Sequence, residues 1–241
     1  MSHEAARAMG LHLVSLASME YEITNRPAFT QLDVTLDSDD GIRAEAGSLV
    51  SCSGGVEVAA GKDDKLRDSL PDSVLEKHSP FSTTFTVNRR GTVTLSPPFP
   101  GDIFHYELRD ETLYTPSRSF LAAELGVELD AEFSSGQTFI ECAGDFLLEL
   151  SGSGLSFLSS YGATSVVSLD PEEKHVVDTG HVVAFEETVE FSDHRLGGVK
   201  SSTRKGEGLA CEFEGPGTIW MQSRSPAAFL AWLVSNLPDE R

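Results

Sequence analysis

The sequence predicts an all-β protein made of three pseudo-symmetric β-hairpin or sandwich repeats packed as one β body, with one short C-terminal helix. The first observation is the pattern of residues 146–158, where apolar residues alternate on both sides of two glycines. Residues 209–221 show the same pattern, and residues 81–95 show it around a single glycine, Gly91. Apolar alternation around a glycine turn is typical of a β-hairpin with one buried face. We therefore expect three such hairpins.

The second observation is a repeated triplet, Val-Glu followed by an apolar residue, at 56–58, 127–129 and 189–191. An apolar residue lies seven positions before each triplet's valine, namely Leu49, Phe120 or Val182. Self-similarity of this kind indicates repeated structural units. We predict one domain over 19–224, with repeats at about 29–100, 101–164 and 165–224. One repeat alone would expose an apolar face and open strand edges, so the three should pack about a pseudo-threefold axis.

The segments outside the repeats have their own signals. We expect residues 1–18 to be a disordered or weakly helical leader, since Glu4 and His12 do not fit a secretory signal. An insertion at 61–79 interrupts the first repeat and carries helical spacing that Pro71 limits to one or two turns. In 225–241, Ser225-Pro226 predicts the start of a helix. That helix should cap the β body or dock on a neighbouring subunit.

Composition restricts the classes of partner. The chain has 38 acidic and 18 basic residues, a net charge of −20, and the acidic residues are scattered along it. Such a surface suits a halophilic, salt-rich cytosol better than a dedicated acidic binding site, and it repels nucleic acid and anionic lipid. No apolar run is long enough for an integral membrane segment. Three widely spaced cysteines indicate a reducing, cytoplasmic setting: Cys52, Cys142 and Cys211.

Candidate chemistry is sparse. The glycine pairs lack a following Lys-Ser/Thr, Ser153 lacks the context of a nucleophile elbow, and no His-x-His occurs. We therefore predict no catalytic residue, no cofactor and no enzymatic activity. The metal candidates are the central residues of the triplets, Glu57, Glu128 and Glu190. These carboxylates would bind a cation if they converged on an axis, whereas strand alternation predicts that they point outward.

Six stretches together resemble a known family, and they are listed here: MEYEI at 19–23, AEAGSLV at 44–50, PGDI at 100–103, VDTGHVVAF at 177–185, GGVKS at 197–201 and QSRSP at 222–226. They are similar to the prokaryotic branch of the altered-inheritance-of-mitochondria, or mitochondrial biogenesis, family. The resemblance implies an all-β fold like that of the tryptophan RNA-binding attenuation protein, and a tendency to self-associate. It implies no reaction and no catalytic residues. Residues 62–68, KDDKLRD, replace the apolar glycine-rich loop that members often carry.

Three functional hypotheses follow. The first is a non-enzymatic, homo-oligomeric cytosolic β scaffold or interaction protein, for which a trimer is one assembly and an unidentified protein a further partner. The alternative is a small-molecule or metal-binding module, including a cryptic enzyme, with a site near the pseudo-threefold axis. RNA binding by analogy of fold is the least favoured, because of the negative charge.

Overall fold

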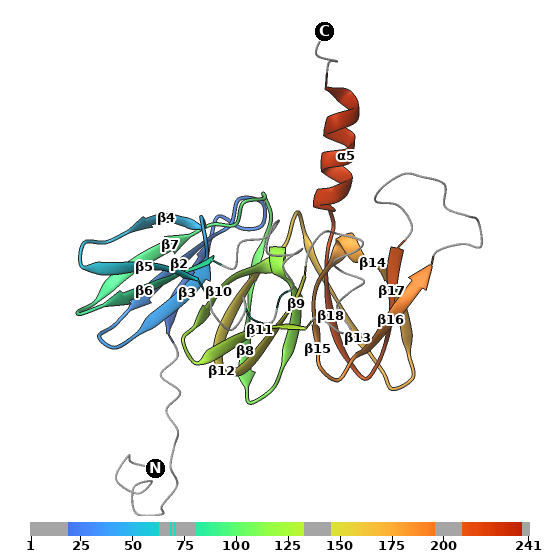
Figure 1. Cartoon of the computed structure of the whole chain (residues 1–241), viewed down its shortest axis with the longest axis horizontal. Helices are drawn as coiled ribbons and strands as arrows, with labels where there is room; N and C mark the ends of the chain where they lie inside the picture. Colours follow the sequence, from blue (N-terminus) through green and yellow to red (C-terminus); the bar gives the residue numbers. More distant parts are fainter. Residues whose placement is uncertain are drawn as a thin grey trace, which may run out of the picture.

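The computed structural model describes residues 19–62, 68, 70, 81–132, 146–195 and 209–237. The described chain is mostly β-strand, as predicted, and ends in a single helix, α5 (Pro226–Asn236) (Figure 1). The strands of residues 19–95 are β1 (Glu20–Thr24), β2 (Gln31–Leu36), β3 (Gly41–Glu45), β4 (Leu49–Cys52), β5 (Val56–Lys62), β6 (Phe81–Val87) and β7 (Gly91–Leu95). Residues 103–159 form β8 (Ile103–Arg109), β9 (Leu113–Pro116), β10 (Phe120–Glu124), β11 (Val127–Glu132) and β12 (Leu147–Ser159). Residues 164–222 form β13 (Thr164–Leu169), β14 (Lys174–Asp178), β15 (Val182–Glu186), β16 (Glu190–Arg195), β17 (Leu209–Glu214) and β18 (Gly217–Gln222).

The same order of strand pairing occurs three times along the chain. In residues 31–95, β7 pairs with β2 and β4, while β6 pairs with β3 and β5. In residues 164–222, β18 pairs with β13 and β15, while β17 pairs with β14 and β16. In the middle, the long β12 replaces two strands and pairs with β8 and β10 at one end and with β9 and β11 at the other. Each group therefore forms two small sheets, and the exact repeat boundaries stay a prediction.

The glycine stretches are not hairpin turns, and this part of the prediction was wrong. No ladder joins β6 to β7 or β17 to β18, because the two strands of each pair belong to different sheets. In the middle group, Gly152 and Gly154 lie inside the continuous strand β12, with φ of 96° and 142°. Glycine adopts these angles without the strain that a side chain would add. The glycines therefore let a strand pass from one sheet of a sandwich to the other.

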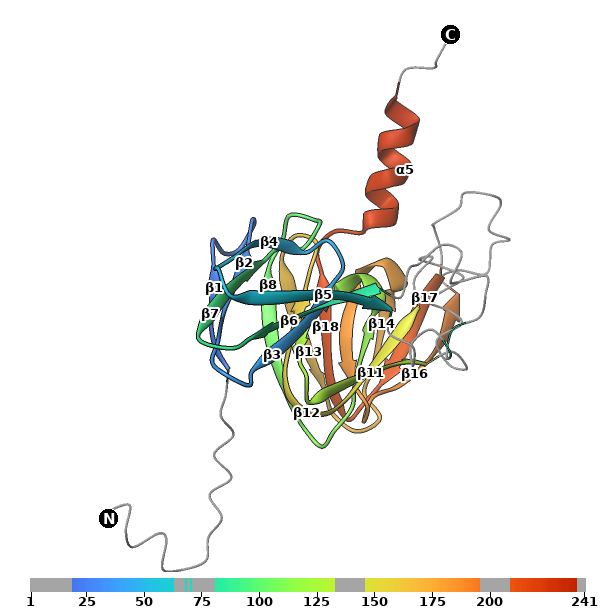
Figure 2. The same cartoon turned by 60° about the vertical axis from the view of Figure 1, so that its left-hand side comes forward.

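The three sandwiches stand side by side in a row (Figures 1 and 2). Two ladders join them: β3 pairs with β10, and β9 pairs with β15. These ladders connect the sandwiches through one path of nine strands, with β8 and β11 branching from it. The sequence predicts closure about a pseudo-threefold axis, whereas the described strands of 31–95 make no ladder with those of 164–222. Each junction uses one strand edge from each neighbour, so a row of three sandwiches leaves one such edge open at either end.

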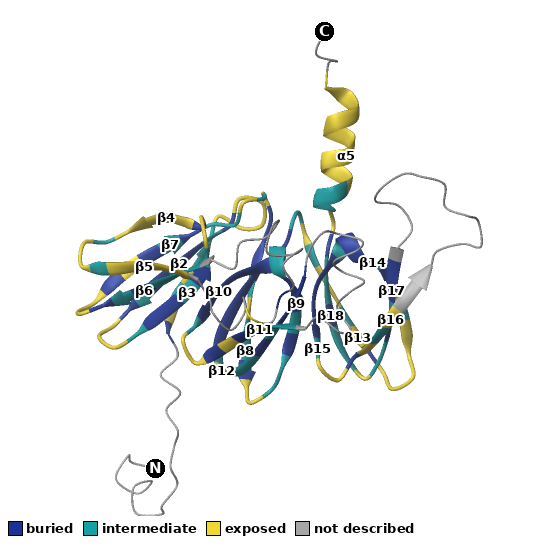
Figure 3. Ribbon diagram, viewed as in Figure 1, coloured by how far each residue is buried: buried dark blue, intermediate teal, exposed yellow. Residues whose placement is uncertain are grey.

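Each sandwich has its own core, and neighbouring cores share residues across the junctions. Phe85 and Phe157 lie in the first cluster although they come from different sandwiches. Ala184, from β15, packs in the middle cluster, and Leu147, from β12, packs in the third. Buried residues line the strands of all three sandwiches, whereas β4, β5 and most of α5 are exposed (Figure 3). The row is therefore packed as one body.

Candidate interaction surfaces

The three glutamates proposed as metal ligands lie in three different sandwiches. Glu57 is on β5, Glu128 on β11 and Glu190 at the start of β16, and all three are exposed. The carboxylate of Glu57 accepts a hydrogen bond of 2.7 Å from Asn88 Nδ2. Within the described ranges, no group of three or more His, Cys, Asp or Glu side chains is placed to hold a metal ion. Outward orientation on exposed strand faces accounts for their positions.

Other residues considered from the sequence have structural contacts. His181 Nδ1 is 2.8 Å from the carbonyl oxygen of Gln222, so the ring ties β18 to the turn before β15. Ser153 Oγ donates a hydrogen bond to Asp110 in a surface turn. Cys211 is a buried thiol and Cys52 an exposed one. Cys142 lies outside the described residues, and so does most of the insertion at 61–79. The contacts of His181 and Ser153 join segments that lie far apart along the chain.

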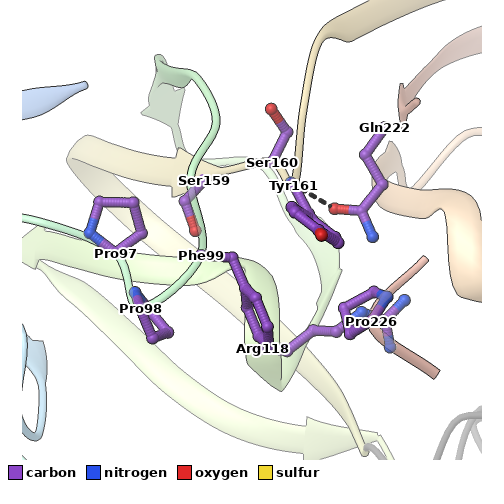
Figure 4. A pocket seen from close by; sticks show the side chains of 9 residues that line it. All are labelled: Pro97, Pro98, Phe99, Arg118, Ser159, Ser160, Tyr161, Gln222 and Pro226. Carbon is purple, nitrogen blue, oxygen red and sulfur yellow. Dashed lines mark hydrogen bonds between the residues drawn. The ribbon is translucent and has the colours of Figure 1, made fainter. Parts of the chain in front are cut away.

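A small hollow lies where the linker at 97–99, the end of β12 and the base of α5 meet (Figure 4). It is lined by Pro97, Pro98, Phe99, Arg118, Ser159, Ser160, Tyr161, Gln222 and Pro226. Gln222 is buried; it accepts from the backbone N–H of Tyr161 at 2.8 Å and donates to the carbonyl of Gly180 at 2.9 Å. Arg118 Nη2 donates to the carbonyl of Thr179 at 3.0 Å. The hollow has room for little more than a water molecule, so it is a joint rather than a substrate site.

An ion pair fixes the first sandwich against the second. Asp102 is buried and accepts hydrogen bonds from Arg26 at 2.9 and 2.7 Å, one to each carboxylate oxygen. It also accepts from the Thr30 hydroxyl at 3.3 Å and from the backbone N–H of Ile103 at 2.9 Å. The hydrogen bond to Asp102 raises the pKa of Arg26. Because one carboxylate satisfies several donors, it ties the β1–β2 turn to the start of β8.

One hydrogen bond recurs at equivalent positions of the three sandwiches. The side chain of Ser53 accepts from the backbone N–H of Thr92, that of Glu124 from Leu155 and that of Glu186 from Thr218, at 2.8–2.9 Å. Glu186 also reaches the neighbouring sandwich, where the Tyr106 hydroxyl donates to it at 3.5 Å. Burial, followed by the charge of Glu186, raises the pKa of Tyr106. The two glutamates therefore stand at junctions, and the shorter serine stands at the open end of the row.

Helix α5 does not cap the β body, which corrects one of its two expected roles. Ser225 caps its first turn and Pro226 is its first residue, as predicted. Ring contacts from Phe99 to Tyr161 and from Tyr161 to Phe229 hold its base. Beyond the base the helix projects away from the sheets, and none of its residues is buried (Figure 1). Exposed fractions reach 61% at Trp232 and 70% at Val234.

Among the described residues, no helix is both long enough and apolar enough to cross a membrane.

Sequence reasoning missed Asp102, Arg118 and the outward direction of α5. Asp102 carried a signal, because a carboxylate directly before the buried Ile103 at the start of β8 needs partners there. Arg118 and α5 carried none. Their roles depend on contacts across sandwich junctions, which alternation within one strand does not encode.

Comparison with known proteins agrees with this fold. A crystal structure of a Streptococcus pyogenes protein superposes with a TM-score of 0.74 at 24% identity, covering 91% of this chain and all of that one. An uncharacterised protein of Streptococcus pyogenes serotype M6 is 25% identical over 228 residues, 91% of this chain and 92% of its own length. The model of the family described as mitochondrial biogenesis AIM24 matches residues 21–224. This chain therefore belongs to the AIM24 mitochondrial biogenesis family.

Proposed function

We propose that this protein is a non-enzymatic β scaffold that assembles with copies of itself through α5 and acts through protein contacts in the cytosol. The observation that carries the proposal is an apolar helix left in solvent. Its eleven residues, PAAFLAWLVSN, contain no charge, and none is buried. A helix that is apolar over most of its circumference is normally covered by protein.

The shape of the helix favours other copies of α5 as its cover. Five bulky residues, Phe229, Leu230, Trp232, Leu233 and Val234, spread over about 200° of the helix circumference at 3.6 residues per turn. The opposite side carries Ala227, Ala228, Ala231 and Ser235. A face this wide is more than one neighbouring helix covers, so a bundle of at least three identical helices suits it. A membrane surface suits it less, because surface-lying helices usually carry basic residues and this one carries none.

The cytosolic setting and the absence of an activity are parts of the same proposal. Exposed Cys52 and buried Cys211 are both thiols rather than disulfides, as a reducing compartment would keep them. The contacts described above use the polar side chains to join strands and sandwiches. A scaffold role needs no more chemistry than these contacts supply.

The test is the mass in solution, measured by sedimentation velocity over a range of concentrations. The wild type should form particles heavier than the 26.0 kDa chain. The double variant Leu230→Glu/Val234→Glu places two charges on the bulky face and should lower the mass of the particles, because it removes the contacts made by α5. The matched control Ala231→Glu/Ser235→Glu places the same charges on the small face and should keep the assembly. A wild type that stays at 26.0 kDa at every concentration contradicts the proposal.

A further inference from the structure

The open ends of the row are complementary strand edges. At both internal junctions, the second strand of one sandwich pairs with the third strand of the next: β3 with β10, and β9 with β15. The corresponding strands at the two ends are β4 and β14. On the side equivalent to the junction, neither has a ladder partner among the described strands. Figure 1 places β4 and β14 toward opposite ends of the row.

Burial shows that β4 lacks a neighbour that its counterparts have. Leu49 is 40% exposed, whereas the equivalent Phe120 and Val182 are 4% and 0% exposed. Val50 is 52% exposed, whereas Leu121 and Val183 are fully buried. All four residues of β4 are exposed, whereas the first four of β10 and of β15 are buried. β4 thus has the apolar residues of the junction strands β10 and β15, but no described strand of a neighbouring sandwich covers them.

β14, at the other end of the row, is also less buried than its counterparts. β3 and β9 each have three buried residues, whereas β14 has one, Val177. Val176 is 39% exposed. A free strand edge is usually protected by a proline or a charged residue. β4 has neither, and the charged residues of β14, Lys174 and Asp178, lie only at its two ends. Two unprotected edges therefore remain.

We propose that β4 of one copy pairs antiparallel with β14 of a second copy, which repeats the internal junction between molecules. This inference rests on the proposed self-association and adds its direction: the contact is head to tail, so it builds closed rings or open chains rather than isolated twofold dimers. The occupant is a second copy of this chain because the missing partner of each end is present at the other end.

The internal junctions fix the register of this pairing. Ala123 lies opposite Arg43 at the first junction, and Phe185 lies opposite Tyr114 at the second. The same offsets along the repeats place Cys52 opposite Val176, Ser51 opposite Val177 and Ser53 opposite His175. Directly opposed side chains in antiparallel strands have Cβ atoms about 4.5–5.5 Å apart, close to the span of a disulfide. The native thiol of Cys52 can therefore form a disulfide with a cysteine placed at position 176 of a second copy.

The experiment is disulfide trapping of the full chain carrying Val176→Cys, oxidised with diamide and separated on a non-reducing gel. Val176 is partly exposed, so the substitution should leave the unfolding temperature unchanged. The expected result is a cross-linked dimer and higher species that reducing agent removes. Adding Cys52→Ser should abolish these species. The matched control His175→Cys moves the thiol to the other face of β14 and should give far less product.

The outcomes separate this inference from the proposed function. Cross-linking of Val176→Cys that depends on Cys52 supports strand pairing between copies. A wild type that is oligomeric by sedimentation, with no cross-link in the variant, overturns the strand pairing and leaves the assembly through α5 standing. A product that depends on Cys52 but runs at the mass of one chain overturns it as well, since the row would then close within a single molecule. A monomeric wild type with no cross-link contradicts both.

Discussion

Three equivalent residues, Val50, Leu121 and Val183, provide a matched test of the open end. Leu121 and Val183 are fully buried at the junctions, and Val50 is 52% exposed on β4. Replacing Leu121 by alanine should lower the free energy of unfolding by about 2–5 kcal/mol, through lost burial and the cavity left behind. Val183→Ala removes the equivalent of two methylenes at about 0.8 kcal/mol each, plus a cavity contribution, so about 2 kcal/mol. Val50→Ala should cost at most about 0.5 kcal/mol, as surface substitutions do.

Thermal unfolding at the lowest usable protein concentration measures this difference. A loss of 2 kcal/mol corresponds to about 4–8 °C in Tm for a chain of this size, so Val183→Ala should be clearly separated from wild type. Val50→Ala should shift Tm by about 1–2 °C at most on the same scale. Equal shifts for the two valine variants would refute the reasoning, because β4 would then be covered within the single chain.

The remaining predictions concern the joints and the charge. Asp102→Ala should lower the free energy of unfolding by about 2–4 kcal/mol in chemical denaturation, because the buried Thr30 hydroxyl and the Ile103 N–H lose their acceptor; the exposed Glu187→Ala should change it by less than about 0.5 kcal/mol. An unchanged free energy of unfolding in Asp102→Ala would show that the hydrogen bonds of Asp102 do not stabilise the fold. The raised pKa of Tyr106 means that the unfolded chain loses this proton first, so stability should fall as pH rises above the ordinary tyrosine pKa of about 10, and Tyr106→Phe should reduce that slope. A slope identical in both proteins would exclude Tyr106 as its source. Self-association should strengthen with added salt, because each copy carries a net charge of −20 and the screening length falls from about 30 Å at 0.01 M to about 3 Å at 1 M. Dissociation by salt would instead indicate that ion pairs hold the assembly.

Apolar alternation predicted much of the fold. It identified β-strand structure on both sides of Gly152 and Gly154. Leu49, Phe120 and Val182, which the repeats made equivalent, each prove to begin a strand, β4, β10 or β15. Capping chemistry placed the start of α5 correctly at Ser225 and Pro226. These features are local, because they depend on residues that lie close together along the chain.

The errors concern relations between strands. A glycine pair between two alternating segments fits a hairpin turn, but it fits equally well a strand that passes from one sheet to another, as β12 does. Apolar residues in α5 predicted burial, yet no local signal indicates whether the covering surface belongs to the same chain. The exposure of Leu49 and Val50 could not be predicted either, since their sequence matches that of the buried strands β10 and β15.

Hydrogen–deuterium exchange at increasing protein concentration tests the central claim most directly. If a second copy completes the row, the backbone amides of β4 and β14 that point away from β7 and β17 should exchange quickly in dilute protein and slowly when it is concentrated. The amides of β10 and β15, already paired inside the chain, should stay protected throughout. Exchange at β4 and β14 that does not change with concentration, in a protein whose mass shows assembly, would contradict the account.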